Sequence, residues 1–242
     1  MSIRRIWAVA RRNLAQLRHD PRTIALMILA PILLMTLLKY VYIDQPQVFQ
    51  KVAAALLGVF PMLVMFLITS VATLRERTSG TLEKLLIMPI TKLEFILGYA
   101  KAFGIAALIQ ATIVTSVAVG PLGLKIAGSQ LMLIVVAILD ALLGLAIGLF
   151  VSSLAKTEFQ AVQFMPAVLL PQLLLSGLLA PRESLPNGFR QVSDFLPLSY
   201  AVDATQKVIS GAGSLKTDFL VIALFLFLLL GAGAATLRRQ SK

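Results

Sequence analysis

The sequence predicts an all-α membrane protein with six transmembrane helices, and three observations lead to this prediction. The 242 residues are 58% hydrophobic and only 14% charged, with a mean hydropathy of +0.89, whereas soluble domains carry about a quarter charged residues. The apolar residues fall into uncharged runs that approach or exceed the ~20 residues a spanning helix needs. The basic residues concentrate on one side of these runs. We therefore expect one transmembrane domain covering residues 1–242.

Six segments are predicted to cross the membrane. They cover residues 23–43, 52–74, 98–120, 130–152, 159–180 and 218–237. The first is long enough when the Lys39 amine extends toward the outer headgroups. The fifth contains Pro166 and Pro171, which lack a backbone N–H, so this helix should kink or be supported by its neighbours. The remaining large segment, 181–216, is predicted to lie outside.

The distribution of Lys and Arg predicts the orientation. With a cytoplasmic N-terminus, fifteen basic residues lie inside: Arg4, Arg5, Arg11, Arg12, Arg18, Arg22, Arg75, Arg77, Lys84, Lys92, Lys101, Lys156, Arg238, Arg239 and Lys242. Six lie outside: Lys51, Lys125, Arg182, Arg190, Lys207 and Lys216. Because loops rich in Lys and Arg stay in the cytoplasm, both termini are predicted to be cytoplasmic. This bias also accounts for the net charge of +11, so the charge does not have to indicate binding of nucleic acid.

Residues 1–20 are predicted to form an amphipathic helix in the membrane interface. Apolar residues recur at helical spacing, namely Ile3, Trp7, Ala10, Leu14 and Leu17, while arginines occupy the other faces. Asp20-Pro21 should end this helix, because the residue before proline avoids the α region. A simple topogenic block of charge is the alternative. The regularity of the apolar stripe favours the helix.

Residues 75–92 are predicted to form a cytoplasmic segment with a short helix. Thr78-Ser79-Gly80 is typical of a turn, and a helix from Thr81 to about Met88 would place three leucines on one face, namely Leu82, Leu85 and Leu86. Pro89 ends it. Thr91 and Glu94 have the spacing of a capping box, so the next helix should begin there. Local physics alone leaves an ordinary loop as the alternative.

Several chemistries are excluded by composition. The chain has no cysteine and one histidine, His19, which excludes disulfides, thiolate metal sites and two-histidine motifs. It contains neither a phosphate-binding G-x-x-x-x-G-K-[ST] loop nor a Gly-Lys dipeptide. No two acidic residues share a span, so an intramembrane enzyme is not expected. Transport would need ATP hydrolysed by another polypeptide, or an ion gradient.

Polar residues within the spans are candidates for a transport path. Asp140 lies near the middle of the fourth span, where it could make a structural hydrogen bond, contact a cationic substrate or relay protons. Gln163 and Gln172 lie in the fifth span. Phe60 and Met65, beside Pro61, are equally compatible with lipid contact and with an apolar route. Gly144 and Gly148 form a GxxxG pair that suits close helix packing.

Three blocks of sequence resemble the permeases of type-2 ATP-binding-cassette (ABC) transporters. The string from Glu76 to Pro89, ERTSGTLEKLLIMP, resembles the family signature of an acidic residue, Ser-Gly-Thr-Leu-Glu, two leucines and a proline. Residues 175–204 resemble the family pattern between the fifth and sixth spans, and Asn13 to Pro31 fits the family's N-terminus. The family commonly has an arginine after the Asp-Ala pair; here Thr205 follows, and no role is assigned there.

The resemblance implies a function. It implies a non-catalytic, six-span permease subunit of the bacterial or archaeal inner membrane, surrounded by lipid, paired with an identical or related subunit. Two cytosolic ATPase subunits would bind ATP and magnesium and grip a coupling helix that involves Glu76, Arg77, Gly80, Thr81, Leu82, Glu83, Leu85, Leu86 and Pro89. Residues 181–216 would form re-entrant helices. Drug-type export of a small hydrophobic or lipid-like substrate is expected; a gradient-driven carrier or channel is the alternative.

Overall fold

The computed structural model describes residues 1–81 and 90–236, and within them the secondary structure is helical without strands. In chain order the elements are α1 (Ile3–Arg18), α2 (Pro21–Val41), α3 (Pro46–Leu57), α4 (Phe60–Thr78), α6 (Lys92–Val119), α7 (Gln130–Ser152), α8 (Glu158–Leu175), the 3-10 turn η1 (Arg182–Ser184), α9 (Asn187–Asp194), α10 (Pro197–Ser210) and α11 (Lys216–Thr236). The predicted all-α class is confirmed.

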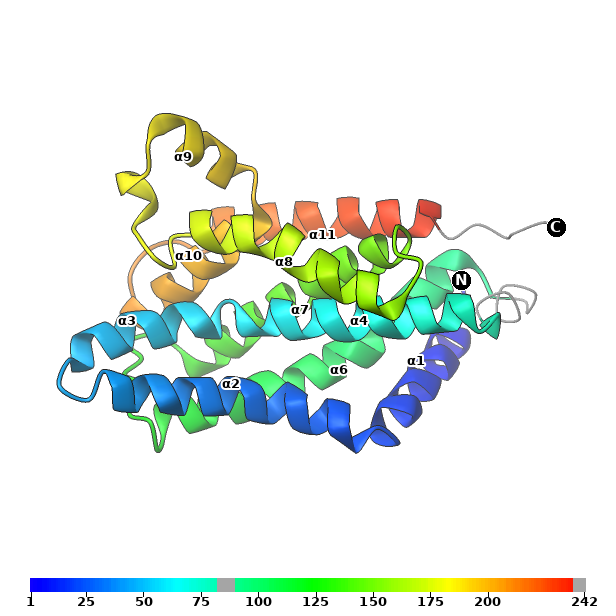
Figure 1. Ribbon diagram of the computed structural model, residues 1–242, viewed down its shortest axis with the longest axis horizontal. Helices are drawn as coiled ribbons and strands as arrows, with labels where there is room; N and C mark the ends of the chain where they lie inside the picture. The colour runs from blue at the N-terminus through cyan, green and yellow to red at the C-terminus, as the bar shows by residue number, and fades with distance from the viewer. Residues whose placement is uncertain (82–89, 237–242) are drawn as a thin grey trace.

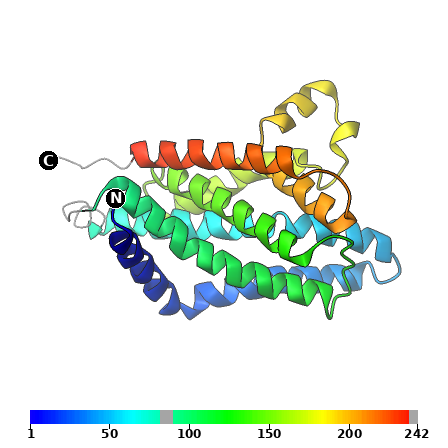
Figure 2. The ribbon, with the colours of Figure 1, turned by 180° about the vertical axis from the view of Figure 1, so that it is seen from behind.

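The long helices lie side by side along the longest axis of the molecule (Figure 1). The N-terminus, the end of α4, the start of α6 and the end of α11 lie together at one end, and α9 and α10 lie toward the other (Figures 1 and 2). The ends of the described chain are therefore on one side of the bundle.

Five segments of the described chain have the length and hydropathy of membrane spans: Pro21–Val41, Pro46–Thr78, Lys92–Val119, Gln130–Ser152 and Lys216–Gly233. The shorter helix α8 is not among them. Its 18 residues contain two prolines, three glutamines and a glutamate, which reduce its mean hydropathy. The findings thus establish a multi-pass membrane protein, without confirming the predicted number of six spans.

The helix of the second predicted span, residues 52–74, is interrupted. Helix α3 ends at Leu57, and α4 begins at Phe60 after Gly58 and Val59. Pro61 occupies the first turn of α4, where its missing N–H and its ring prevent the regular bond to the carbonyl of Leu57. Glycine is also the weakest helix former after proline. Hydropathy alone does not reveal this interruption, and the segment still has the length and hydropathy of one span.

Close backbone packing joins α4 to α7. A Cβ atom added to Gly144 would lie 2.1 Å from the Met62 carbonyl oxygen, and one added to Gly148 would lie 2.6 Å from the Phe66 carbonyl oxygen. Only glycine allows this approach. The GxxxG pair therefore packs against the helix that follows the break, as expected for small residues at membrane helix interfaces.

Helix α1 packs against α6 by a face that includes one residue of the predicted apolar stripe, Ala10. Its buried residues are Ile6, Val9, Ala10 and Asn13, whereas Ile3 and Trp7 from the predicted stripe are exposed. Gly98 of α6 permits the contact, because a Cβ there would lie 2.5 Å from the Val9 side chain. The interfacial position of α1 stays a prediction.

Two predicted helix boundaries are confirmed. At the start of α6, the Thr91 hydroxyl accepts from the Glu94 N–H (3.2 Å) and the Glu94 carboxylate accepts from the Thr91 N–H (2.9 Å), which is the capping box. Helix α1 ends at Arg18, and α2 begins at Pro21 with Asp20 as its N-cap. The Thr23 hydroxyl and N–H donate to the Asp20 carboxylate and lower its pKa below the ordinary value.

Polar contacts connect the elements of segment 181–216. The Arg182 guanidinium donates to Ser193, Asp194 and Asp203, joining η1 to α9 and α10. Ser193 donates to the Leu175 carbonyl at the end of α8 (2.7 Å). Lys207 of α10 pairs with Asp218 of α11 at 2.7 Å. These contacts attach the helices between α8 and α11 to both neighbours.

Candidate functional site

The last turn of α4 contains three consecutive charged residues that contact four other helices. We call Arg75, Glu76 and Arg77 the junction. They directly precede the turn that leads into the predicted coupling helix. Their side chains point in different directions around α4, because successive residues are about 100° apart on a helix.

Glu76 is the buried member of the junction, with 6% of its surface exposed. One carboxylate oxygen accepts from Arg12 of α1 at 2.6 Å, and the other accepts from the Tyr99 hydroxyl of α6. Both oxygens are thus satisfied, as a buried carboxylate requires. Tyr99 in turn packs between Phe95 and Phe103. Glu76 therefore connects α4 to α1 and α6.

The two arginines connect α4 to α7 and α8. Arg77 donates to the carbonyl of Ser152 at 2.6 Å, one of the last-turn carbonyls that have no partner within α7. Arg75 forms two hydrogen bonds, of 3.0 and 3.1 Å, to the carboxylate of Glu158 in the first turn of α8. The side chains of this second pair are well exposed. Arg77 thus contacts α7, and Arg75 contacts α8.

Part of the predicted coupling site lies within the described residues. Gly80 has φ +68°, a left-handed conformation that glycine adopts without strain, and ends the turn after α4. The Thr81 hydroxyl lies 2.9 Å from that of Ser79. Leu82, Glu83, Leu85, Leu86 and Pro89 lie outside the described residues, so their predicted role stays a prediction.

Asp140 of α7 lies at the break in the second span. It is buried, and its Oδ2 atom accepts from the N–H of Met62 at 3.1 Å. Met62 is in the first turn of α4, where N–H groups have no partner within the helix. A carboxylate there is also favoured by the helix dipole. Of the three roles considered for Asp140, this bond fits the structural one, as a cap for α4, while the Oδ1 atom is buried without a hydrogen-bond partner in the described chain.

Substitutions of Asp140 should separate capping from substrate contact. Asp140→Asn keeps an oxygen acceptor and should leave the thermal unfolding of the purified protein nearly unchanged. Asp140→Leu leaves the Met62 N–H without an acceptor and should cost about 1–3 kcal/mol. Equal destabilisation by both substitutions would contradict the capping role, and selective loss of cationic substrates in Asp140→Asn would indicate substrate contact.

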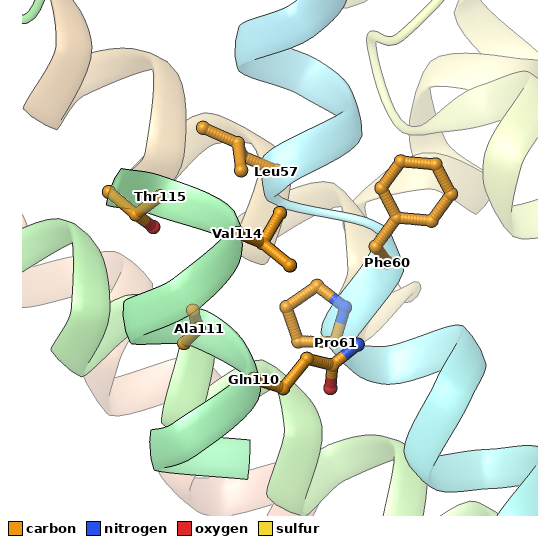
Figure 3. Close-up of a pocket in the computed structure, with 8 residues that line it drawn as sticks. Leu57, Phe60, Pro61, Gln110, Ala111, Val114 and Thr115 are labelled. Carbon is orange, nitrogen blue, oxygen red and sulfur yellow. The ribbon is translucent and has the colours of Figure 1, made fainter. Parts of the chain in front are cut away.

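A small cavity lies beside the break (Figure 3). It is lined by Leu57, Phe60, Pro61, Gln110, Ala111, Val114, Thr115 and Ala137. The Gln110 amide donates to the Met27 carbonyl of α2 at 3.1 Å. Its Oε1 atom is buried without a hydrogen-bond partner in the described chain. Apart from Gln110 and Thr115, the lining is apolar.

The other predicted path residues do not form one surface. Phe60 lies in the apolar cluster with Phe49 and Val114, and Met65 in the separate cluster with Phe95 and Tyr99. Both are buried inside the bundle. On α8, Gln163 is exposed, whereas Gln172 is buried and donates to the Val168 carbonyl at 3.2 Å. Of the four, Phe60 alone lines the cavity at the break.

Sequence reasoning missed Arg12, Tyr99 and Gln110. Arg12 was assigned to the membrane surface with the other arginines of α1, and Tyr99 and Gln110 were given no role. One signal was present: a glutamate among apolar residues near a span end requires a partner when buried. The sequence alone does not say which of the many arginines provides it.

The architecture and the comparisons with known proteins agree. Long apolar helices packed through glycines, with capped helix ends inside the bundle, define a multi-pass membrane protein. The model of the family described as ABC-2 type transporter matches residues 4–209. Because this match covers most of the chain, the protein belongs to that family, which the sequence motifs had indicated.

Three relatives illustrate the similarity. A probable multidrug ABC transporter permease of Escherichia coli, YbhR, is 29% identical over 157 residues, which are 65% of this chain and 43% of YbhR. The E. coli inner membrane transport permease YhhJ is 32% identical over 148 residues, 60% of this chain and 40% of YhhJ. ABC transporter G family member 20 of Dictyostelium discoideum is 27% identical over 180 residues, which are 72% of this chain and 25% of that relative. The chain thus spans less than half the length of these relatives.

Proposed function

We propose that this chain is the transmembrane subunit of an ATP-driven exporter of a small hydrophobic or lipid-like substrate. ATP and magnesium bind to separate cytosolic ATPase subunits, and an identical or related permease subunit completes the complex. The observation that carries the proposal is the junction. In a member of the ABC-2 type family, the last turn of α4, directly before the turn that leads into the predicted coupling helix, is bonded to α1, α6, α7 and α8. A force applied there would reach the whole bundle.

The proposal includes a single domain with six spans, formed by α2, α3 with α4, α6, α7, α8 and α11, and with both termini in the cytoplasm. The position of both ends of the described chain, at the start of α1 and the end of α11, on one side of the bundle supports an even number of crossings (Figures 1 and 2). Segment 181–216 then lies at the exterior face as re-entrant helices.

Reporter fusions test this topology. A fusion at Lys92 or Gln240 should report the cytoplasm, and a fusion at Asn187 should report the exterior, because the basic residues lie mainly on the side of the termini. A reporter with activity only in the periplasm and one with activity only in the cytoplasm should give opposite results at each site. A cytoplasmic signal at Asn187 would contradict the six-span topology.

If the predicted coupling helix docks on the ATPase, substituting two of its leucines should weaken binding of the ATPase. Leu85→Ala with Leu86→Ala should weaken co-purification of the ATPase, since loss of one anchoring side chain typically costs about 2 kcal/mol or more. The permease should keep its elution profile and thermal unfolding. Leu93→Ala, at a 55% exposed leucine of α6, is the matched control and should leave co-purification intact. Unchanged ATPase binding in the double variant would contradict this docking surface.

A gradient-driven carrier is the second candidate, and transport in liposomes separates the two. The bond of the buried Asp140 to the Met62 N–H supports the exporter, because it gives this acid a use that needs no proton transfer. The purified chain should accumulate substrate only together with its ATPase and ATP. Sustained uphill transport by this chain alone, driven by a proton gradient, would exclude the exporter.

A further inference from the structure

The five arginines of α1 divide into two sets with different surroundings. Arg5 lies 3.7 Å from the Glu94 carboxylate, and Arg12 lies 2.6 Å from the Glu76 carboxylate. These two arginines are seven residues apart, so they share one side of the helix. That side borders the face packed on α6.

Arg4, Arg11 and Arg18 form the second set. They are also spaced by seven residues, so they lie in a row along α1, about 10 Å apart along its axis. All three are exposed, and none forms an ion pair with the described part of the chain. Three unpaired cations in one row mark a surface for anions. We call Arg4, Arg11 and Arg18 the arginine row.

An exposed apolar strip accompanies the arginine row. Trp7 is three residues after Arg4 and four before Arg11, so its side chain lies between them on the helix surface. Trp7 is 47% exposed and Ile3 is 71% exposed. The Lys101 amine of α6 lies 3.5 Å from the centre of the Trp7 ring, which adds a fourth cation beside the same strip. Cations and an exposed tryptophan side by side are typical of the membrane interface.

We propose that the arginine row, with Trp7 and Lys101, binds acidic phospholipid headgroups of the cytoplasmic leaflet. The phosphates pair with the guanidinium groups, and Ile3 and Trp7 contact the adjoining acyl chains. A phospholipid supplies anion and hydrocarbon together, whereas nucleic acid would leave Ile3 and Trp7 in water. The inference depends on the proposed cytoplasmic position of α1 and not on transport.

This binding would regulate the proposed coupling. Arg12 of the same helix holds Glu76 of the junction, and Ser2 donates to Glu94 at the start of α6 at 2.6 Å. An acidic bilayer that holds the outer side of α1 also stabilises these inner contacts. A neutral bilayer offers only the apolar contact, so the junction is held less firmly there.

The single tryptophan of the chain makes the test direct. The purified full-length protein is reconstituted in phosphatidylcholine vesicles that contain an equal fraction of phosphatidylglycerol, with bromine on the acyl chains of either one lipid or the other. Bromine quenches Trp7 only at contact. Brominated phosphatidylglycerol should occupy the Trp7 site at least about fivefold in preference to brominated phosphatidylcholine, the ratio that one basic residue near an acidic surface provides.

Variants identify the residues responsible. Arg4→Gln, Arg11→Gln and Arg18→Gln together should abolish the preference, and Arg11→Gln alone should reduce it. The matched control removes three exposed cations elsewhere, by Lys51→Gln, Arg190→Gln and Lys216→Gln, and should retain it. Equal quenching by both lipids in the natural protein would overturn the proposal. So would a preference that survives the triple variant, or an absence of quenching by either lipid.

Discussion

Gly144→Ala is expected to prevent stable packing of the bundle. The added Cβ atom would lie 2.1 Å from the Met62 carbonyl oxygen and 2.8 Å from the Met62 carbonyl carbon. These are backbone atoms, so no side-chain rotation relieves the overlap, and α4 and α7 must separate. Overpacking a close interface costs about 1–3 kcal/mol when side chains adjust, and the cost here should reach or exceed the upper value.

The measurement is the melting temperature and the monodisperse yield of the detergent-purified protein. Gly231→Ala is the matched control, since a Cβ at Gly231 of α11 would meet no atom within 4 Å. The control should behave like the natural protein or slightly better, because alanine favours helix more than glycine does. If the Gly144→Ala variant has the same melting temperature as the natural protein, the close approach of α4 to α7 is refuted.

Glu76→Ala is expected to lower the stability of the protein by the second-largest amount. It removes the carboxylate that accepts from Tyr99 and pairs with Arg12, and it leaves the buried Tyr99 hydroxyl without its acceptor. Breaking a buried ion pair costs about 3–5 kcal/mol. Since the Arg12 side chain is 29% exposed and can reach water, about 2–3 kcal/mol is expected here. Transport coupled to ATP should decrease as well, because α1 loses its bond to the junction.

The Arg75–Glu158 pair provides the comparison within the same junction. Its side chains are 63% and 48% exposed, and exposed pairs contribute at most about 1 kcal/mol. Glu158→Ala should therefore shift thermal unfolding far less than Glu76→Ala. Glu76→Gln retains an acceptor for Tyr99 and should be intermediate. Equal shifts for Glu76→Ala and Glu158→Ala would show that burial of Glu76 contributes nothing.

Local features of the fold could be predicted from the sequence because they depend on neighbouring residues. The capping box at Thr91 and Glu94 and the helix boundary at Asp20-Pro21 each involve residues within three positions. The helix over residues 130–152 also has the predicted bounds, since Ser129 and the following apolar run define it. Short-range chemistry decides these elements.

Features that depend on distant residues could not be predicted. The break after Leu57 lies in an apolar run, and its capping group, Asp140, is 78 positions from Met62. The choice of Arg12 as the partner of Glu76 depends on how α1 packs on α6. A single sequence shows that a buried carboxylate needs a partner, but tertiary packing selects the partner.

The attachment of α4 to α7 at both ends has a mechanical consequence. Near its start, α4 is held by Asp140, and near its end Arg77 donates to the carbonyl of Ser152 at the end of α7. With the glycines of α7 packed on its backbone between these points, α4 cannot slide along α7, so the pair behaves as one rod. Gly58 and Val59, whose N–H groups donate to carbonyls three residues back, at Ala55 and Leu56, interrupt the helix just before this rod. We expect a push at the junction to be passed along the rod to that interruption.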